Sequence, residues 1–125
     1  MPLPSPQHAA RRAPRTRFNE TTPAVLRFHN GCRTRGKLQI ISITGGLLSL
    51  PKPLYQGSRV KLMFLTPKGS VFGAAEMLSP IDWGLQPFKF TRLHDDDEER
   101  LQAAIQSSLD QNRRSVAQVE RFRVW

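Results

Sequence analysis

The sequence contains only one cysteine, Cys32, and no long apolar stretch. A single cysteine excludes an internal disulfide framework and a zinc site built from several cysteines, and it suits a reducing compartment. No apolar run approaches the roughly 18 residues that a membrane-spanning helix needs. The first residues also lack the apolar segment of a secretory signal. We therefore expect a cytoplasmic protein without a membrane span.

Side chains with catalytic or metal-binding chemistry are also few. His8, His29 and His94 lie far apart, without the spacing of metal ligands or of a nucleophile and its base. Half of the ten acidic residues lie in one run, residues 95–99. That run lacks the alternating oxygen ligands and the glycine turn of a calcium loop. The sequence therefore predicts no enzyme, no metal site and no cofactor.

Positive charge is abundant instead. The 125-residue chain has 19 Lys and Arg against 10 Asp and Glu, a net charge of +9. Its length suits one domain rather than two. A surface of this sign attracts polyanions such as nucleotides, nucleic acid, acidic proteins or anionic lipid. We therefore look for an anionic ligand or partner.

Turn residues divide the middle of the chain into short apolar strands. Asn30-Gly31 favours a tight hairpin turn, and Gly45-Gly46 is expected to end the second strand. The six predicted strands cover residues 24–29, 33–43, 47–50, 59–66, 71–78 and 84–93. Pro87 in the last strand predicts an edge or a bulge, because proline cannot donate to a ladder. Local connections of this kind indicate an all-β fold, an antiparallel six-stranded barrel.

Helix is expected only after the last strand. The carboxylates at 95–99 suit a solvated helix N-terminus, where they oppose the positive end of the dipole. Leu101, Ile105 and Leu109 then recur at helical spacing, which predicts a helix from about residue 95 to at least 110. Phe88 and Phe90, at alternating strand positions, are expected to face the core. Residues 112–125 form a basic tail that can continue as a helix. Such a helix could pack on the barrel, pair with a second copy or dock on a partner, and packing on the barrel is the favoured interpretation.

Residues 1–17 are interpreted as a flexible basic arm, with four prolines and four arginines. Arg11 and Arg15 in this arm have an Arg-x-x-x-Arg spacing, and Arg12 lies between them. Guanidinium groups bind phosphate through two hydrogen bonds and stay charged at physiological pH. An arginine arm can therefore close over an anion. The alternative is a disordered basic tail without a ligand.

A second motif lies where the second predicted strand ends, in residues 40–46 (IISITGG). The Ser42 hydroxyl can hydrogen-bond a polar ligand or satisfy the local backbone. Gly45 and Gly46 allow a close approach of the backbone to a ligand, or simply a turn. The residues alone leave both interpretations open.

Taken in this order, the two motifs resemble the PilZ family. These bacterial β-barrel domains bind cyclic di-GMP through an Arg-x-x-x-Arg arm and an Asp/Asn-x-Ser-x-x-Gly motif at a strand end. The resemblance covers about residues 11–110 and implies a PilZ-like barrel plus helix at residues 18–111. It implies cyclic di-GMP as the ligand, held by Arg11, Arg12 and Arg15 on one side and by Ser42, Thr44, Gly45 and Gly46 on the other.

The sequence departs from the family motif at its first position, where Ile40 replaces Asp or Asn. In the family this side chain hydrogen-bonds a guanine, and losing such a contact costs about 1–3 kcal/mol. We expect Ile40 to share one face of the strand with Ser42, because residues two apart point the same way. The alternative is that Ile40 points into the core and Ile41 points outward. The favoured function is a cyclic di-GMP receptor. The alternative is a degenerate domain that binds a protein through its barrel surface or C-terminal helix, without nucleotide; nucleic acid is not favoured.

Overall fold

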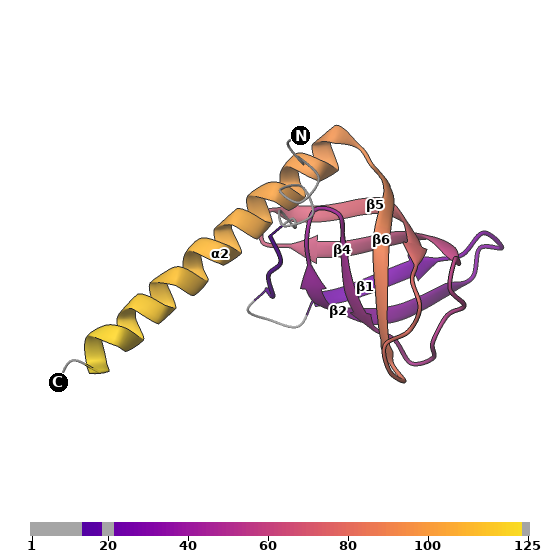
Figure 1. Ribbon diagram of the computed structural model, residues 1–125. Helices are drawn as coiled ribbons and strands as arrows, with labels where there is room; N and C mark the ends of the chain where they lie inside the picture. Colours follow the sequence, from indigo (N-terminus) through magenta and orange to yellow (C-terminus); the bar gives the residue numbers. More distant parts are fainter. Residues whose placement is uncertain (1–13, 19–21, 124–125) are drawn as a thin grey trace, which may run out of the picture.

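The structure, a computed structural model, describes residues 14–18 and 22–123, with side chains up to residue 111. Six strands close into a barrel in the spatial order β1-β2-β3-β6-β5-β4 (Figure 1). They are β1 (Thr22–Arg27), β2 (Arg33–Ile41), β3 (Gly45–Ser49), β4 (Arg59–Thr66), β5 (Gly69–Met77) and β6 (Leu85–Leu93). Every neighbouring pair is antiparallel. The predicted six-stranded antiparallel barrel is therefore confirmed.

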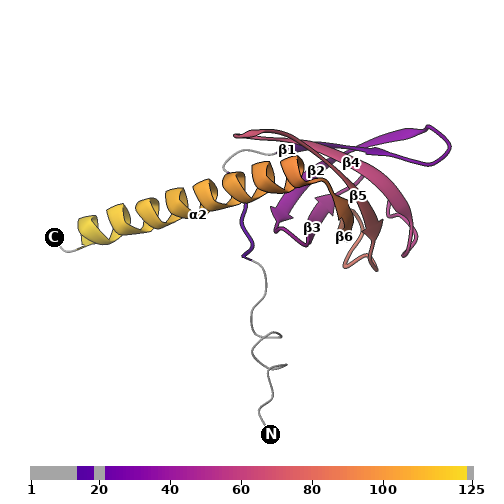
Figure 2. The same ribbon diagram turned by 90° about the horizontal axis from the view of Figure 1, so that it is seen from above.

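One helix, α2 (Asp95–Arg123), follows β6 directly. Its first turns pack against the barrel, and its second half extends away from it in both views (Figures 1 and 2). The prediction of a helix through residues 112–123 is thus correct, and the prediction that this segment packs back on the barrel is wrong. Residues 110–115 (DQNRRS) contain no apolar side chain, so the buried stripe of the helix ends there.

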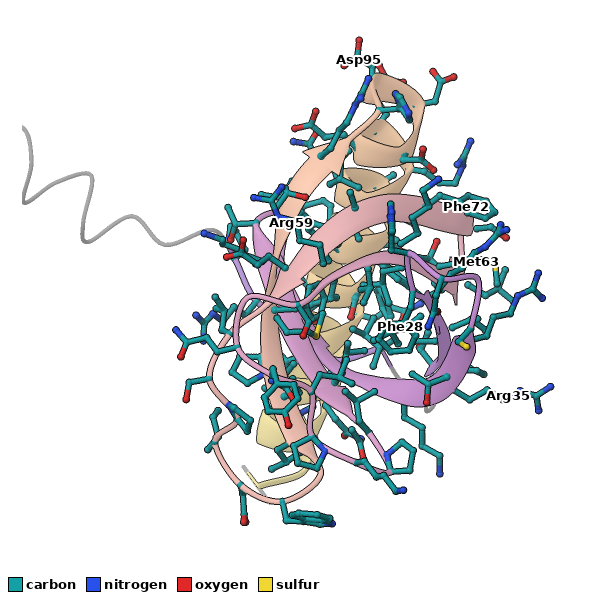
Figure 3. All side chains as sticks on the ribbon, turned by 90° about the vertical axis from the view of Figure 1, so that its right-hand side faces the viewer. Phe28, Arg35, Arg59, Met63, Phe72 and Asp95 are labelled. Carbon is teal, nitrogen blue, oxygen red and sulfur yellow. The ribbon has the colours of Figure 1, made fainter. Side chains whose placement is uncertain are left out.

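The core fills the barrel with side chains from alternate strand positions. Phe64, Leu26, Leu62, Leu48, Ile41 and Met77 are the largest strand residues that are fully buried and apolar. Phe88 is 2% exposed and Phe90 packs against it edge to face, with ring centroids 5.3 Å apart, so both expectations are confirmed. Leu101 and Ile105 of α2 belong to the same core, so the helix closes one end of the barrel. Intervening residues such as Arg35, Arg59 and Phe72 point outward (Figure 3).

Two of the predicted turn signals have different outcomes. Asn30-Gly31 does close the β1–β2 hairpin: Gly31 has a φ of 87°, and the Asn30 side chain accepts a hydrogen bond from Cys32 N at 2.9 Å. Gly45 and Gly46, in contrast, lie inside β3 rather than ending β2, so that prediction is wrong. The reason is that β3 approaches both of its neighbouring strands closely at these two residues.

Pro87 marks neither an edge nor a bulge. It lies opposite Leu47 in a closed barrel, and the irregularity of the β5–β6 pair is at Ala74/Ala75 instead. The Pro87 carbonyl accepts a hydrogen bond from Leu78 N at 2.9 Å, just beyond the last residue of β5. In an antiparallel pair the nitrogen of Pro87 would face Leu78 O, and that carbonyl accepts a hydrogen bond from Gln86 Nε2 at 2.6 Å instead, so the missing N–H of Pro87 leaves no acceptor unpaired.

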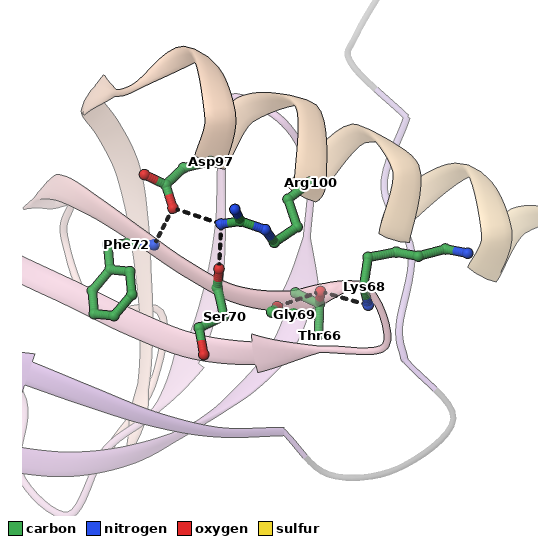
Figure 4. A network of polar contacts seen from close by, with 7 residues as sticks. All are labelled: Thr66, Lys68, Gly69, Ser70, Phe72, Asp97 and Arg100. Carbon is green, nitrogen blue, oxygen red and sulfur yellow. Dashed lines mark hydrogen bonds and ion pairs between the residues drawn. The ribbon is translucent and has the colours of Figure 1, made fainter.

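The acidic start of α2 is only partly solvated, which corrects the expectation for residues 95–99. Asp97 is buried, and its Oδ1 accepts hydrogen bonds from Phe72 N at 3.0 Å and from Arg100 Nη1 at 3.3 Å (Figure 4). The same Arg100 nitrogen donates to Ser70 O at 2.8 Å. A carboxylate that is shared between a β5 amide and a helix guanidinium fixes the first turn of α2 to β5.

Candidate functional site

The end of the N-terminal arm is paired with the end of β2. Thr16 N donates to Ile41 O at 3.0 Å, and Ile41 N donates to Thr16 O at 2.9 Å, so the two residues form an antiparallel bridge. Both side chains are buried, Thr16 at 5% and Ile41 at 1% exposure. Thr16 of the predicted arm is therefore joined to the barrel by two backbone hydrogen bonds and by burial, while the flexibility of the arm as a whole stays a prediction.

The helix holds the same segment from its other side. Ser108 Oγ donates to Arg17 O at 3.0 Å and lies 2.8 Å from Thr16 Oγ1, in a buried contact. Figure 2 shows one end of the indigo arm segment next to the first half of α2. Residues 14–18 thus lie between β2 and α2, and the position of the arm depends on both.

The bridge register determines which arm residues face the second motif. Counting one residue each way from Thr16 and Ile41, Arg15 lies opposite Ser42 and Arg17 lies opposite Ile40. Both arginines are exposed, as expected for neighbours of an inward-facing residue. The structure therefore brings Arg15 to the predicted strand end. Arg11 and Arg12 lie outside the described residues.

Ile40 lies on the outer side of the barrel, as predicted. A bulge between Leu38 and Ile40 lets both Leu38 and Ile41 enter the core, although they are three residues apart. Ile40 is half-buried, beside the arm. The alternative, in which Ile40 occupies the core and Ile41 points outward, is wrong. An apolar side chain thus occupies the position at which a polar contact to a guanine was expected.

The Ser42 hydroxyl is fully engaged in the turn between β2 and β3. Its Oγ donates to Gly45 O at 3.0 Å, accepts from Thr44 N at 3.3 Å and lies 3.1 Å from Thr44 Oγ1. Since the Ser42 proton goes to the Gly45 carbonyl, the Thr44 hydroxyl is the donor of the last contact. The exposed Thr44 Oγ1 then keeps free acceptor capacity, while Ser42 has none. Ser42 shapes the turn, and Thr44 presents a polar atom.

The double glycine allows β3 to lie unusually close to both neighbouring strands. A Cβ at Gly45 would collide with Phe88 O, and a Cβ at Gly46 would collide with Ile40 O. Both of these atoms are backbone, which cannot move aside cheaply. The two glycines are thus required by the packing of β3 between β2 and β6, whether or not a ligand approaches them.

Two cations that sequence reasoning missed border the same area. Arg17 and Arg15 flank Thr16, so the bridge places both beside the end of β2. Lys89 of β6 lies opposite Gly45. Lys89 Nζ is 3.4 Å from a Glu76 carboxylate oxygen, and its side chain stays about half exposed, at 54%. The alternation of Arg15 and Arg17 was visible in the sequence, but only the bridge reveals what they face. For Lys89 no sequence signal existed, because β3–β6 pairing is non-local.

A hollow of about 500 Å³ lies between the arm and α2. Its lining includes Pro14, Ile43, Glu99, Ile105 and Leu109. None of the predicted ligand residues lines it, so it is adjacent to the candidate site rather than part of it. The candidate site is the open surface formed by Arg15, Arg17, Ile40, Thr44 and Lys89.

The described part of the chain contains no group of three His, Cys, Asp or Glu side chains that could hold a metal ion. Cys32 is free and exposed beside the β1–β2 turn. Within the same residues, no helix is long and apolar enough to cross a membrane. The site therefore offers hydrogen-bonding groups and positive charge, which are suited to binding an anion.

No family model and no curated protein matches the sequence. Several solved structures are similar in shape. The PilZ domain with c-di-GMP of YcgR from Escherichia coli is 20% identical, with a TM-score of 0.69, over 86% of this chain and 97% of that one. The K. pneumonia MrkH–c-di-GMP complex is also 20% identical, with a TM-score of 0.71, over 84% of this chain and 54% of that one. The PilZ domain of CeSA from a cellulose-synthesizing bacterium is 16% identical, with a TM-score of 0.58.

These likenesses show that the chain has the PilZ-domain fold, as the resemblance of its motifs implied. The chain spans almost the whole length of the isolated PilZ domains, but only about half of MrkH and of the longer YcgR structure.

Proposed function

We propose that this PilZ-fold chain is a receptor for cyclic di-GMP that has no catalytic activity of its own. The observation that carries the proposal is the Thr16–Ile41 bridge, which holds Arg15 beside the strand-end motif. An arginine arm and a strand-end turn that are 25 residues apart in sequence thereby form one surface. The solved structures of YcgR and MrkH with c-di-GMP, which share this fold, support the choice of ligand.

The chemistry of the surface suits a nucleotide with two phosphates and two guanines. Arg15 can bind a phosphate through two hydrogen bonds, and Lys89 adds a positive charge across β3. Thr44 Oγ1 can accept a hydrogen bond from a guanine N–H, and Ile40 offers an apolar surface to the base. Binding would also draw in Arg11 and Arg12 of the arm.

Arg17 compensates in this proposal for the departure at Ile40. An arginine can donate two hydrogen bonds to guanine, one to O6 and one to N7. The apolar side chain of Ile40 can form neither of them. Arg17 lies opposite Ile40 in the bridge register, so it is a charged group beside the position of the missing contact. A cytoplasmic location completes the proposal, since an exposed free cysteine suits a reducing compartment.

Isothermal titration of the full chain with cyclic di-GMP tests the proposal. We expect saturable binding, weakened about tenfold or more by Arg15→Ala, because a charge-assisted phosphate contact is worth about 1.5–3 kcal/mol. Arg35→Ala is the matched control, since Arg35 is also exposed but lies in the part of β2 that pairs with β1, away from the arm. Cyclic di-AMP, which has the same phosphates, should bind more weakly. Equal affinity for both nucleotides, or equal effects of the two substitutions, contradicts the proposal.

The alternative function, a protein-interaction module without nucleotide, is favoured by one observation. Ile40 leaves an apolar side chain at the position that the nucleotide-binding motif fills with a polar one. A folded chain that shows no heat and no saturation with cyclic di-GMP would support this alternative.

A further inference from the structure

The outer surface of the barrel carries a row of basic side chains that the candidate site does not use. Cross-strand pairing aligns five outward positions on successive strands: Arg33, Arg27, Lys61, Ala74 and Arg92. All four cations are exposed. With strands about 4.8 Å apart, this basic row extends over roughly 19 Å.

The charges of the basic row are not paired with acidic side chains in the part of the chain that the structure describes. Among the described side chains, up to residue 111, no carboxylate lies within ion-pair distance of any of the four cations. Glu76, two residues after Ala74 on β5, pairs with Arg59 at 3.7 Å and with Lys89 at 3.4 Å instead. Like charges directly opposite one another destabilise a sheet. A bound anionic partner would relieve the repulsion among Arg33, Arg27 and Lys61.

An apolar row runs beside the basic row on the same face. Val25 lies opposite Met63, and Met63 lies opposite Phe72. Met63 and Phe72 are seen next to each other on the outer surface in Figure 3. Phe72 is 54% exposed, and Leu65, the next outward residue of β4, is 62% exposed. A partner that covers these apolar side chains removes them from water, which favours binding.

The two rows border a concave surface rather than a flat one. A hollow of about 550 Å³ is lined by both rows and by Gly73 and His94. Ala74, whose side chain is short, lies between Lys61 and Arg92 on the neighbouring strands, and all three residues line the hollow. A second hollow, of about 340 Å³, shares Arg27, Lys61 and Ala74 with the first, so the groove continues toward the β1–β2 hairpin.

We propose that this groove docks an acidic amphipathic helix of a partner protein, laid across the strands. A helix is about 10–12 Å wide, enough to cover two rows that lie about 7 Å apart. Carboxylates at i and i+4 of a helix are about 5–6 Å apart, which matches the spacing of cations on neighbouring strands. Apolar side chains on the adjoining stripe of the same helix would cover Val25, Met63 and Phe72.

The shape and composition of the groove favour this partner over other polyanions. A bilayer is flat and binds protruding apolar side chains, whereas this surface is hollowed at Ala74. Duplex nucleic acid would pair its phosphates with the basic row but leave the apolar row uncovered. Single strands bind through several stacked aromatics, and Phe72 is the one exposed Phe, Tyr or Trp among the lining residues of the larger hollow. The proposal does not depend on cyclic di-GMP.

Fluorescence anisotropy with a labelled peptide tests the proposal on the full chain. The probe is a designed 18-residue helix with glutamates at i, i+4 and i+8 beside a leucine stripe; a scrambled peptide of the same composition is its control. We expect the ordered peptide to bind more tightly than the scrambled one, than a single-stranded oligonucleotide, and than vesicles containing phosphatidylserine. Tighter binding of any of these three competitors overturns the proposal.

Substitutions then locate the binding. Lys61→Glu should weaken the peptide about tenfold, since it reverses the central charge of the row. Lys52→Glu, at an exposed lysine outside the groove, should leave binding unchanged. Phe72→Ser should also weaken the peptide, because it removes apolar contact without changing charge. Lys61→Glu removes a like-charge contact, so an unchanged or raised melting temperature will show that the variant folds. Equal affinities of the Lys61 and Lys52 variants, or no effect of Phe72→Ser, contradict the proposal.

Discussion

Thr16 and Ile41 exchange two backbone hydrogen bonds, with N···O distances of 3.0 and 2.9 Å. This pair joins the N-terminal arm to the barrel at the residue before Ser42. Ser108 of α2 contacts the same arm residues. The arm therefore bonds to β2, contacts α2 and contributes Arg15 to the candidate ligand site.

The first prediction concerns the contact between α2 and the arm. Ser108→Ala removes the donor to Arg17 O and the partner of Thr16 Oγ1 in a buried position. We expect it to lower the stability of the arm, seen as faster hydrogen exchange of the Thr16 and Ile41 amides. The cost should be about 1 kcal/mol, the net value of a hydrogen bond. Ser107→Ala, one residue earlier and only half-buried, is the control.

The same variant reports on the ligand site. If cyclic di-GMP binding requires an ordered Arg15, Ser108→Ala should weaken it several-fold while leaving the melting temperature of the barrel nearly unchanged. Faster exchange at Thr16 without any change in affinity would show that the position of the arm in this structure is not the one that binds.

The second prediction concerns the packing of β3. Gly45→Ala places a methyl group against the Phe88 carbonyl, a backbone contact that cannot relax by side-chain rotation. We expect a loss of about 1–3 kcal/mol, typical of overpacking, in urea unfolding. Gly57→Ala is the comparison: it has open space around the added carbon, but its φ of 89° also disfavours alanine, by about 1 kcal/mol. An equal or smaller loss for Gly45→Ala would contradict the close approach of β3 and β6.

The third prediction concerns Asp97. Asp97→Ala leaves the Phe72 N–H and the Arg100 guanidinium without their shared acceptor. We expect the free energy of unfolding to fall by about 1–3 kcal/mol, the cost of leaving a buried donor unsatisfied. Asp96→Ala, one residue away in the same helical turn but exposed, should cost much less. Similar losses for both would mean that only the helix dipole, and not the bond to β5, matters.

Strand positions can be predicted from the sequence where local chemistry decides them. Asn30-Gly31 specifies a tight hairpin by itself, and the alternation in residues 59–66 predicts the bounds of β4 without error. Gly45-Gly46 predicts a strand end because glycine usually interrupts strands. In the barrel these glycines instead fit between the backbones of β2 and β6, and that depends on pairing between strands distant in sequence.

The candidate site shows the same division. Arg15 and the strand-end motif can be found from residue spacing and a family resemblance. Arg17 and Lys89 cannot, because each becomes a neighbour of the motif only through non-local pairing. The expectation that Asp97 is solvated fails for a similar reason: a run of carboxylates gives no sign of which one meets a free amide of β5.

The last prediction uses Ile40. This side chain is half-buried on the outer side of β2, opposite Arg17, so a polar residue there remains accessible. Ile40→Asn should add a hydrogen-bonding group for guanine and tighten cyclic di-GMP binding by about 1–2 kcal/mol, or roughly five- to thirtyfold. The melting temperature should change little, because the core does not contain Ile40.

Ile41→Asn is the matched control for this experiment. Its side chain is 1% exposed in the core, so the same substitution one residue away buries an amide without partners and should lower the melting temperature strongly. If Ile40→Asn is as destabilising as Ile41→Asn, Ile40 does not lie on the outer side of β2. If Ile40→Asn folds normally and neither it nor the unmodified chain binds cyclic di-GMP, the surface beside Arg15 is not a nucleotide site. The apolar Ile40 then supports the protein-interaction function instead.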